Sequence, residues 1–199
     1  MNIILVGMPA SGKSTVGVVL AKLLGFDYVD TDILIQRSQG KCLEHIIAEK
    51  GMEAFLALEE EICSRLDVFN TVVATGGSVI YSEAAMRHLS ETGPVVYLKT
   101  DLPELSRRIG DMRQRGVVLK PGQTMENLYQ ERVPLYERWA DFTMEGESIE
   151  HTAERIKAVI TNYIERDEVF PSLSAAGKSR RYLQSGIQLL LWRRCCPRL

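Results

Sequence analysis

The segment at residues 7–14, GMPASGKS, constrains this 199-residue chain more than any other. It has the pattern G-x-x-x-x-G-K-[ST], follows a short apolar run at residues 3–6 and precedes a segment of helical period. The pattern is specific in this strand–loop–helix context. Glycines allow backbone conformations closed to other residues, so the loop can aim several N–H groups at one anion beside a helix N-terminus. The segment therefore predicts a phosphate-binding loop.

The residue types in this loop indicate how a nucleoside triphosphate, expected to be ATP with Mg²⁺, would be held. Lys13 is expected to reach the outer phosphates as a point charge, and the Ser14 hydroxyl to ligate the magnesium that bridges them. The alternative, a glycine turn followed by a lysine by chance, does not explain the flanking strand and helix patterns. The loop residues predicted to contact the nucleotide are Gly7, Ala10, Ser11, Gly12, Lys13, Ser14 and Thr15.

Short apolar runs alternate with longer segments of helical period along the chain, which is typical of a parallel sheet with helices on both faces. Strands are predicted at residues 3–6, 28–29, 71–74, 95–98 and 142–144. Helices are predicted at about 13–24, 33–39, 43–66 (interrupted at Gly51), 102–109, 125–140 and 149–164. The order predicts a three-layer α/β fold with a five-stranded parallel sheet.

Two segments depart from this alternation. At residues 110–122 the apolar period lapses, basic residues gather and glycines recur, which predicts a mobile lid. After residue 165 the chain carries seven basic and two acidic residues, a net charge of +5, so residues 1–165 carry −7. We expect one domain at 1–165 and a poorly ordered basic extension at 166–199. The alternative for the extension is a basic helix at 182–194 that touches a membrane.

The overall composition excludes several classes. With 45% apolar and 25% charged residues, a net charge of −2 and a pI near 6.0, nothing global indicates nucleic-acid binding. No apolar run reaches the roughly 18 residues of a membrane span. The four cysteines lack metal-ligand spacing, which favours a reducing compartment. We expect a cytoplasmic monomer that acts on a small molecule.

Beyond the loop, the order of further motifs is informative. Asp30-Thr31-Asp32 follows the second predicted strand, Thr75-Gly76-Gly77 follows the third, and residues 131–136 (ERVPLY) follow the lid segment. Together with the loop, this order resembles the shikimate kinase family over residues 1–165. The resemblance implies a P-loop kinase fold of the nucleoside-monophosphate-kinase type, a lid that closes over ATP, and phosphoryl transfer to the 3-hydroxyl of shikimate in aromatic amino acid biosynthesis.

The resemblance also implies roles for individual residues. Lys13, Asp32 and Arg115 would be catalytic, with Asp32 orienting the attacking hydroxyl and Arg115 bringing charge to the transferring phosphate from the lid. Ser14 would ligate the metal, and Asp30 would approach it through water. The remaining implied contacts are Arg108 near adenine, Gly76 and Gly77 against the substrate, and Arg132 with the substrate carboxylate.

Five of these residues have a plainer interpretation. Asp30 and Asp32 could be an N-cap pair for the helix that follows, since aspartate suits that position. Gly76-Gly77 could be an ordinary strand-to-helix turn. Arg132 could belong to a solvated helix face with Glu131 and Glu137.

The chain departs from the family pattern in the acceptor half of the site. Leu56 stands where the family carries an arginine that shares the substrate carboxylate, Ser78 replaces the third glycine, and Arg115-Gly116 replaces Arg-Pro. Loss of one arm of a two-arginine clamp should cost on the order of 2 to 5 kcal/mol in binding. Shikimate is the first candidate acceptor; the alternatives are a kinase of another small alcohol or hydroxy acid and a non-catalytic nucleotide-binding protein.

Overall fold

The structure, a computed structural model, describes residues 1–109 and 123–169, with side chains up to residue 164. Its centre is a five-stranded sheet in the order β2-β3-β1-β4-β5, and every neighbouring pair is parallel. The strands are β1 (Ile3–Val6), β2 (Asp27–Asp30), β3 (Thr71–Ala74), β4 (Val95–Lys99) and β5 (Phe142–Glu145). The predicted fold class is confirmed.

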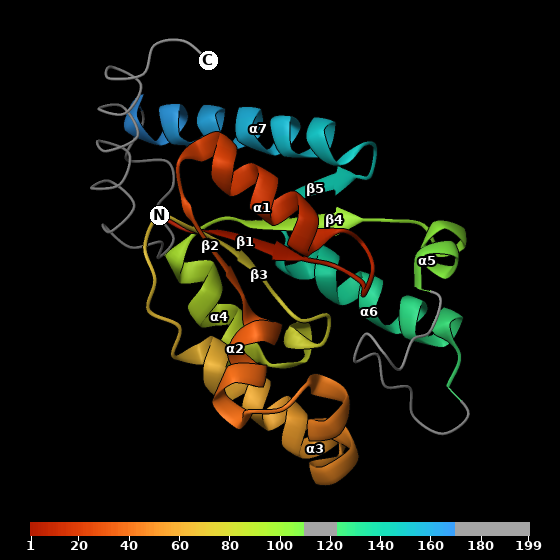
Figure 1. The fold of residues 1–199 in the computed structure, drawn as a ribbon. Helices are drawn as coiled ribbons and strands as arrows, with labels where there is room; N and C mark the ends of the chain where they lie inside the picture. The colour runs from red at the N-terminus through yellow and green to blue at the C-terminus, as the bar shows by residue number, and fades with distance from the viewer. Residues whose placement is uncertain (110–122, 170–199) are drawn as a thin grey trace.

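Helices cover both faces of the sheet (Figure 1). One face packs against α1 (Lys13–Leu24) and α7 (Ile149–Val169) through apolar side chains such as Leu5, Leu20 and Ile156. The other face carries α4 (Glu83–Thr92), α5 (Leu102–Ile109) and α6 (Met125–Trp139), with Ile4, Met86 and Tyr136 in its core. Successive β1 side chains alternate between the two cores because strand side chains point to opposite faces.

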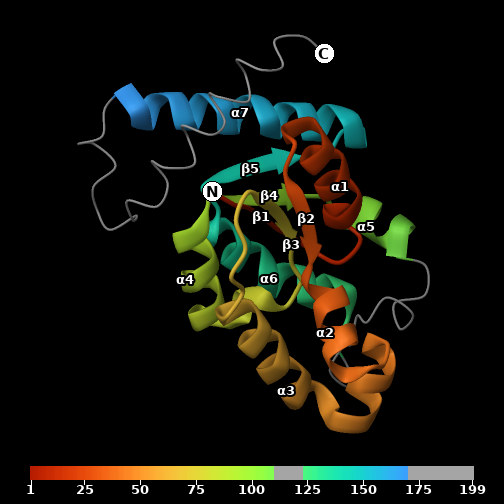
Figure 2. The same ribbon diagram turned by 60° about the vertical axis from the view of Figure 1, so that its left-hand side comes forward.

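A smaller helical layer extends from one end of the sheet, farthest from α7 in the turned view (Figure 2). It consists of α2 (Thr31–Gln39) and α3 (Leu43–Ser64), which share an apolar cluster built around Ile35, Ile46 and Phe55. Gly51, at φ 81° and ψ 170°, is non-helical and kinks α3 at the predicted interruption. This layer forms one wall beside the phosphate-binding loop.

The structure adds two elements that the sequence interpretation missed: the 3-10 helix η1 (Val79–Tyr81) and α4. The signal for α4 was present, because the Ser82 side chain accepts a hydrogen bond from the Ala85 N–H as an N-cap. Helix α7 continues to Val169, beyond the expected boundary at residue 165. The boundary stays a prediction, and the lid (110–122) and residues 170–199 lie outside the described part of the chain.

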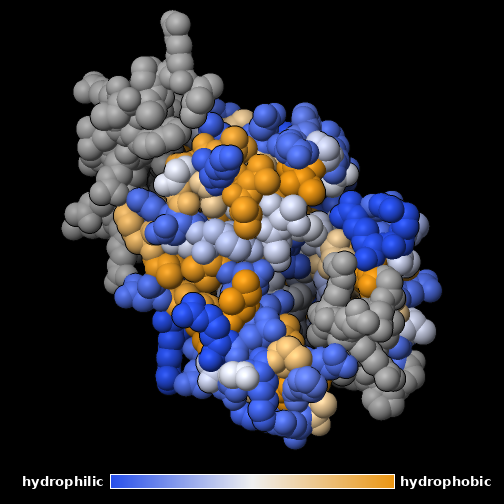
Figure 3. Space-filling view, viewed as in Figure 1, coloured by the Kyte–Doolittle hydropathy of each residue, from blue (hydrophilic) through white to orange (hydrophobic). Residues whose placement is uncertain are grey.

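The described surface shows hydrophilic side chains with apolar patches between them (Figure 3). The exposed large apolar side chains include Val18 on α1, Ile33 on α2, Ile149 on α7 and Phe69 in the connection between α3 and β3. Among the described residues, no helix is long and apolar enough to cross a membrane.

Candidate functional site

A cavity of about 600 Å³ opens at the carboxyl ends of the strands, where open parallel sheets place their ligands. Its lining includes the phosphate-binding loop with the start of α1, the segment 75–78 after β3, and residues of the α2–α3 layer. The cavity thus brings together predicted residues from distant parts of the sequence. They are Ala10, Ser11, Gly12, Lys13, Ser14, Thr15, Asp32, Gly76, Gly77, Arg108 and Arg132.

The loop has the backbone geometry of an anion cradle. Gly12 caps α1 with φ 97°, a left-handed conformation that favours glycine. Ala10 has φ 63°, which is uncommon for a residue with a side chain. Gly7 lies behind the cavity wall, and its carbonyl accepts a hydrogen bond from Lys13. The Ser11 hydroxyl is buried and has no hydrogen-bond partner among the described residues, so it is available to a phosphate oxygen.

Lys13 is folded onto this loop. Its Nζ donates to the carbonyl oxygens of Gly7 at 2.8 Å and Met8 at 2.9 Å, and the side chain is buried. Burial lowers the pKa of Lys13 to about 8, against the opposing effect of Asp32 and Asp30. A phosphate would give this ammonium a stronger, charged acceptor than two carbonyls.

The oxygens beside Lys13 suit magnesium bound together with a nucleotide. Ser14 Oγ donates to Asp30 Oδ2 at 2.8 Å, so a hydroxyl and a carboxylate already face each other. The described residues contain no group of three or more His, Cys, Asp or Glu side chains that could hold a metal alone. Mg²⁺ is usually bound through one or two protein oxygens with phosphates and waters, so this sparse donor set fits it.

Asp30 and Asp32 have different surroundings. Asp30 Oδ1 accepts from the Asp32 N–H at 3.0 Å, so Asp30 is the N-cap of α2 while its second oxygen contacts Ser14. Asp32 lies in the first turn of α2 and lines the cavity. Burial, and then the charge of Asp30, raise the pKa of Asp32 to about 6, with Lys13 opposing. The interpretation as caps therefore applies to Asp30, which can serve as cap and metal-site residue together.

Gly76 marks the tightest point of the cavity floor. Its N–H donates to Thr31 Oγ1 at 3.0 Å, which ties the segment after β3 to α2. A Cβ at this position would overlap Glu59 Oε1 and lie 2.9 Å from Asp32 Oδ1. Only glycine leaves room for both carboxylates, so Gly76 is more than an ordinary turn residue.

Glu59, on α3, is a buried carboxylate for which the sequence interpretation proposed no role. Its Oε2 accepts from Ser78 Oγ at 2.6 Å, and its Oε1 has no hydrogen-bond partner among the described residues. Burial raises the pKa of Glu59 to about 7; the Ser78 hydrogen bond opposes this, and the charge of Asp32 adds to it. Ser78, which replaces the third glycine of the family pattern, lines the cavity and also donates to Glu59.

Arg132 is buried, with only 8% of its surface exposed, and it lines the cavity from α6. The interpretation as a solvated helix face is therefore wrong: Glu137 pairs instead with Lys99, and Glu131 accepts from Tyr81. The Tyr136 hydroxyl donates to the Gly77 carbonyl at 2.6 Å, and Arg132 Nη1 would lie 3.0 Å from a Cβ at Gly77. The guanidinium thus covers the glycine floor.

The wall that belongs to α3 is apolar. Leu43, Met52 and Phe55 line it, while Leu56 packs in the α2–α3 cluster. Arg65 does not fill the space beside Leu56, because it pairs with Glu61 on the surface, where its side chain is 77% exposed. Lys13, Arg108 and Arg132 are the cations that line the cavity within the described residues.

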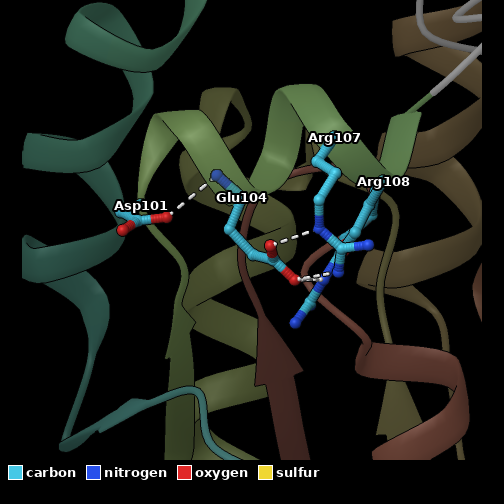
Figure 4. A network of polar contacts seen from close by, with 5 residues as sticks. Asp101, Glu104, Arg107 and Arg108 are labelled. Atoms are coloured by element: carbon cyan, nitrogen blue, oxygen red, sulfur yellow. Dashed lines mark hydrogen bonds and ion pairs between the residues drawn. The ribbon is translucent and has the colours of Figure 1, made fainter.

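Arg108 lies on α5 and lines the cavity. Figure 4 shows its contact with Glu104 on the same helix. Its Nε and the guanidinium of Arg107 both donate to Glu104, and its Nη1 donates to the Ala10 carbonyl at 3.4 Å. Hydrogen bonds from Arg107 and Arg108 lower the pKa of Glu104 to about 2. The backbone N–H of Glu104 donates to Asp101 Oδ1 at the start of α5. Arg115 lies outside the described residues, so its predicted role stays a prediction.

Three residues of the site escaped the sequence interpretation: Thr31, Glu59 and Tyr81. Thr31 could have been singled out from the sequence, because it stands between the two predicted site residues Asp30 and Asp32. The importance of Glu59 and Tyr81 depends on contacts with residues 19 and 50 or 51 positions away.

Comparison with known proteins gives consistent results. A family model described as shikimate kinase matches residues 9–167. The shikimate kinase of Thermobifida fusca is 38% identical over 159 residues, which cover 79% of this chain and 91% of the relative. The structure of the Acinetobacter baumannii shikimate kinase in complex with shikimate superposes with a TM-score of 0.75 at 32% identity, covering 81% of this chain and 93% of that one. The structure of the Aquifex aeolicus shikimate kinase gives 0.71 at 28% identity, covering 82% and 98%.

Proposed function

This chain belongs to the shikimate kinase family, and on that premise we propose that it transfers the γ-phosphoryl group of ATP to a hydroxyl of shikimate, giving shikimate 3-phosphate. One observation carries the proposal: a single cavity joins the phosphate-binding loop, the partly buried carboxylate of Asp32 and the buried guanidinium of Arg132. The solved relative from Acinetobacter baumannii is a complex with shikimate, a small carboxylate with several hydroxyls, which supports the same acceptor here.

The chemistry asks the protein mainly for positioning and for positive charge around the transferring group. A bond forms between the acceptor oxygen and the γ-phosphorus, and the bond from that phosphorus to the β,γ-bridging oxygen breaks, so ADP leaves. The hydroxyl loses its proton in this step, and the carboxylate of Asp32, which lines the cavity, would be the group that takes it. Lys13 would hold the outer phosphates, and Asp32 would accept a hydrogen bond from the attacking hydroxyl and orient it. Ser14 and Asp30 would hold Mg²⁺, which neutralises phosphate charge when bound. Arg132 would bind the acceptor carboxylate, and Arg115 would add charge from the lid.

The roles of the remaining predicted residues follow from their positions. The loop residues Gly7, Ala10, Ser11, Gly12 and Thr15 would cradle the nucleotide, and Arg108 would lie against its base. Gly76 and Gly77 would bring backbone close to the acceptor, because a side chain at either position would meet Glu59, Asp32, Arg132 or Pro9.

Asp32→Asn tests the enzyme assignment. The change removes the charge that orients the hydroxyl while keeping the size of the side chain, so turnover of shikimate in a coupled ADP-release assay should fall by about two orders of magnitude or more. ATP affinity should stay within a factor of two or three. Unchanged turnover would contradict the role of Asp32, and absence of shikimate-dependent turnover in the wild type would contradict the proposed acceptor.

A second candidate acceptor is favoured by the apolar wall of Leu43, Met52 and Phe55 and by Leu56. Among the described residues, Arg132 is the cation that lines the acceptor half of the cavity, so this half also suits a smaller or less polar hydroxy compound. A panel of shikimate, gluconate, homoserine and sugar alcohols, compared by kcat/KM in the same assay, decides between these acceptors. Turnover of none of them by a protein that binds ATP would favour the non-catalytic alternative.

A further inference from the structure

Arg132 is a buried cation that none of the described ion pairs includes. The charge of Glu59 acts on Arg132 without forming an ion pair with it, and burial raises the pKa of Glu59 to about 7. A buried arginine that lacks a direct ionic partner is costly, so its guanidinium is suited to an anionic ligand that enters from the cavity. The direction in which its N–H groups point then decides how such an anion can be bound. A guanidinium offers two bidentate edges, one formed by Nε with a terminal nitrogen and the other by the two terminal nitrogens.

Tyr81, the last residue of η1, occupies one of these edges. Arg132 Nε donates to the Tyr81 hydroxyl at 3.1 Å, and this hydroxyl donates to Glu131 Oε1 at 2.8 Å. Glu131 Oε2 accepts from Gln123 Nε2 at 3.0 Å, so the carboxylate is held from two sides. The carbon at the centre of the guanidinium also lies 5.2 Å from the centroid of the Tyr81 ring, within the range of a cation–π contact.

We infer that Tyr81 is a positioning residue that fixes Arg132 so that its two terminal nitrogens, and not Nε, receive the acceptor carboxylate. Nη1 is directed toward the cavity floor, where it would lie 3.0 Å from a Cβ at Gly77. The inference rests on the proposed function, because it takes the acceptor to be a carboxylate. Because Leu56 stands in place of the second arginine of the family, Arg132 would bind the carboxylate without it. An arginine that is already oriented loses less conformational freedom on binding than a mobile one, which would offset part of that loss.

Tyr81→Phe isolates the hydroxyl, since it keeps the ring that faces the guanidinium. The KM for shikimate should rise about tenfold, the effect expected for loss of one hydrogen bond to a charged group. The kcat and the KM for ATP should stay within about twofold of the wild type. The methyl ester of shikimate, which lacks the negative charge, should show the same KM in the two proteins. A purely structural role for Tyr81 would instead change all these values together.

Tyr129→Phe is the matched control, because it removes a phenol hydroxyl from the same helix as Arg132 but outside the contacts between Glu131, Tyr81 and Arg132. Its KM for shikimate should equal that of the wild type. Crystal structures of the wild type and Tyr81→Phe give a readout that does not depend on the acceptor. In the wild type, Arg132 Nε should donate to the Tyr81 hydroxyl. In Tyr81→Phe, the guanidinium should be displaced or adopt several orientations.

Two results would overturn the inference: a KM for shikimate within twofold of the wild type in Tyr81→Phe, or an unchanged Arg132 orientation in its crystal structure. A wild type that does not turn over shikimate contradicts the proposed function instead, and the pair of crystal structures then decides the role of Tyr81 alone.

Discussion

Replacing Gly76 with alanine would place a methyl group where the buried carboxylate of Glu59 and the partly buried carboxylate of Asp32 converge. The new Cβ would lie 2.9 Å from Asp32 Oδ1, whereas ordinary contact begins at 3.4 Å, so Asp32 must move by at least 0.5 Å. Glu59 must move farther, and it is buried and tied to Ser78. Gly76 is not among the residues with positive φ, so the effect comes from these contacts and not from backbone strain.

We expect two measurable consequences of Gly76→Ala. Overpacking of this kind costs about 1 to 3 kcal/mol in the free energy of unfolding. Displacement of a group that positions the reacting hydroxyl by a fraction of an ångström to 1 Å should lower kcat by about 10- to 100-fold. Urea unfolding and the coupled ADP-release assay measure the two quantities on the same preparation.

Gly40→Ala provides the comparison. Gly40 ends α2 at φ 64°, and a Cβ there would meet nothing within 4 Å. Alanine in that left-handed conformation should cost about 1 to 2 kcal/mol of stability without changing kcat. A kcat of Gly76→Ala within threefold of the wild type would show that turnover does not require the present positions of Asp32 and Glu59.

Two further predictions concern the charged residues of the site. The pKa of Glu59 is about 7 in the folded protein against 4.5 for an ordinary glutamate, so the folded state binds more protons between these values and the free energy of unfolding should fall as pH rises from 4.5 to 7. Glu59→Gln should remove up to about 3 kcal/mol of that fall. The free energy of unfolding is measured by urea titration at several pH values between 4.5 and 7. If it depends on pH in the same way in Glu59→Gln and the wild type, Glu59 is not neutral at low pH in the folded protein. Lys13→Ala should abolish measurable ATP binding in calorimetry while leaving the fold intact by circular dichroism, because the phosphates lose their buried cation. Retention of wild-type ATP affinity would show that the backbone of the loop suffices.

Local chemistry was enough to predict most of the fold. The apolar runs of the five strands, the glycines that end α1 and α2, and the kink at Gly51 are encoded by nearby residues, so the expected elements agree with the structure to within a few positions. The phosphate-binding loop is local in the same sense, since its glycines, Lys13 and Ser14 occupy consecutive positions. Helix α4 could also have been predicted, from the Ser82 cap and its apolar residues Ala85, Met86 and Leu89.

The acceptor half of the site depends on tertiary structure. Sequence alone left open whether Arg132 was solvated, and it assigned nothing to Glu59 or Tyr81. Parallel strands bring the ends of β2 and β3 to one edge, so Asp32, Glu59 and Gly76 meet there although α2 and α3 separate them along the chain. Burial at that edge then raises the pKa of the two carboxylates and removes Arg132 from water. Local motifs and their order were enough to predict a phosphate-binding loop in a parallel α/β fold. Only the packing of distant segments decided which charges face the acceptor, because burial and long-range contacts are properties of the folded chain.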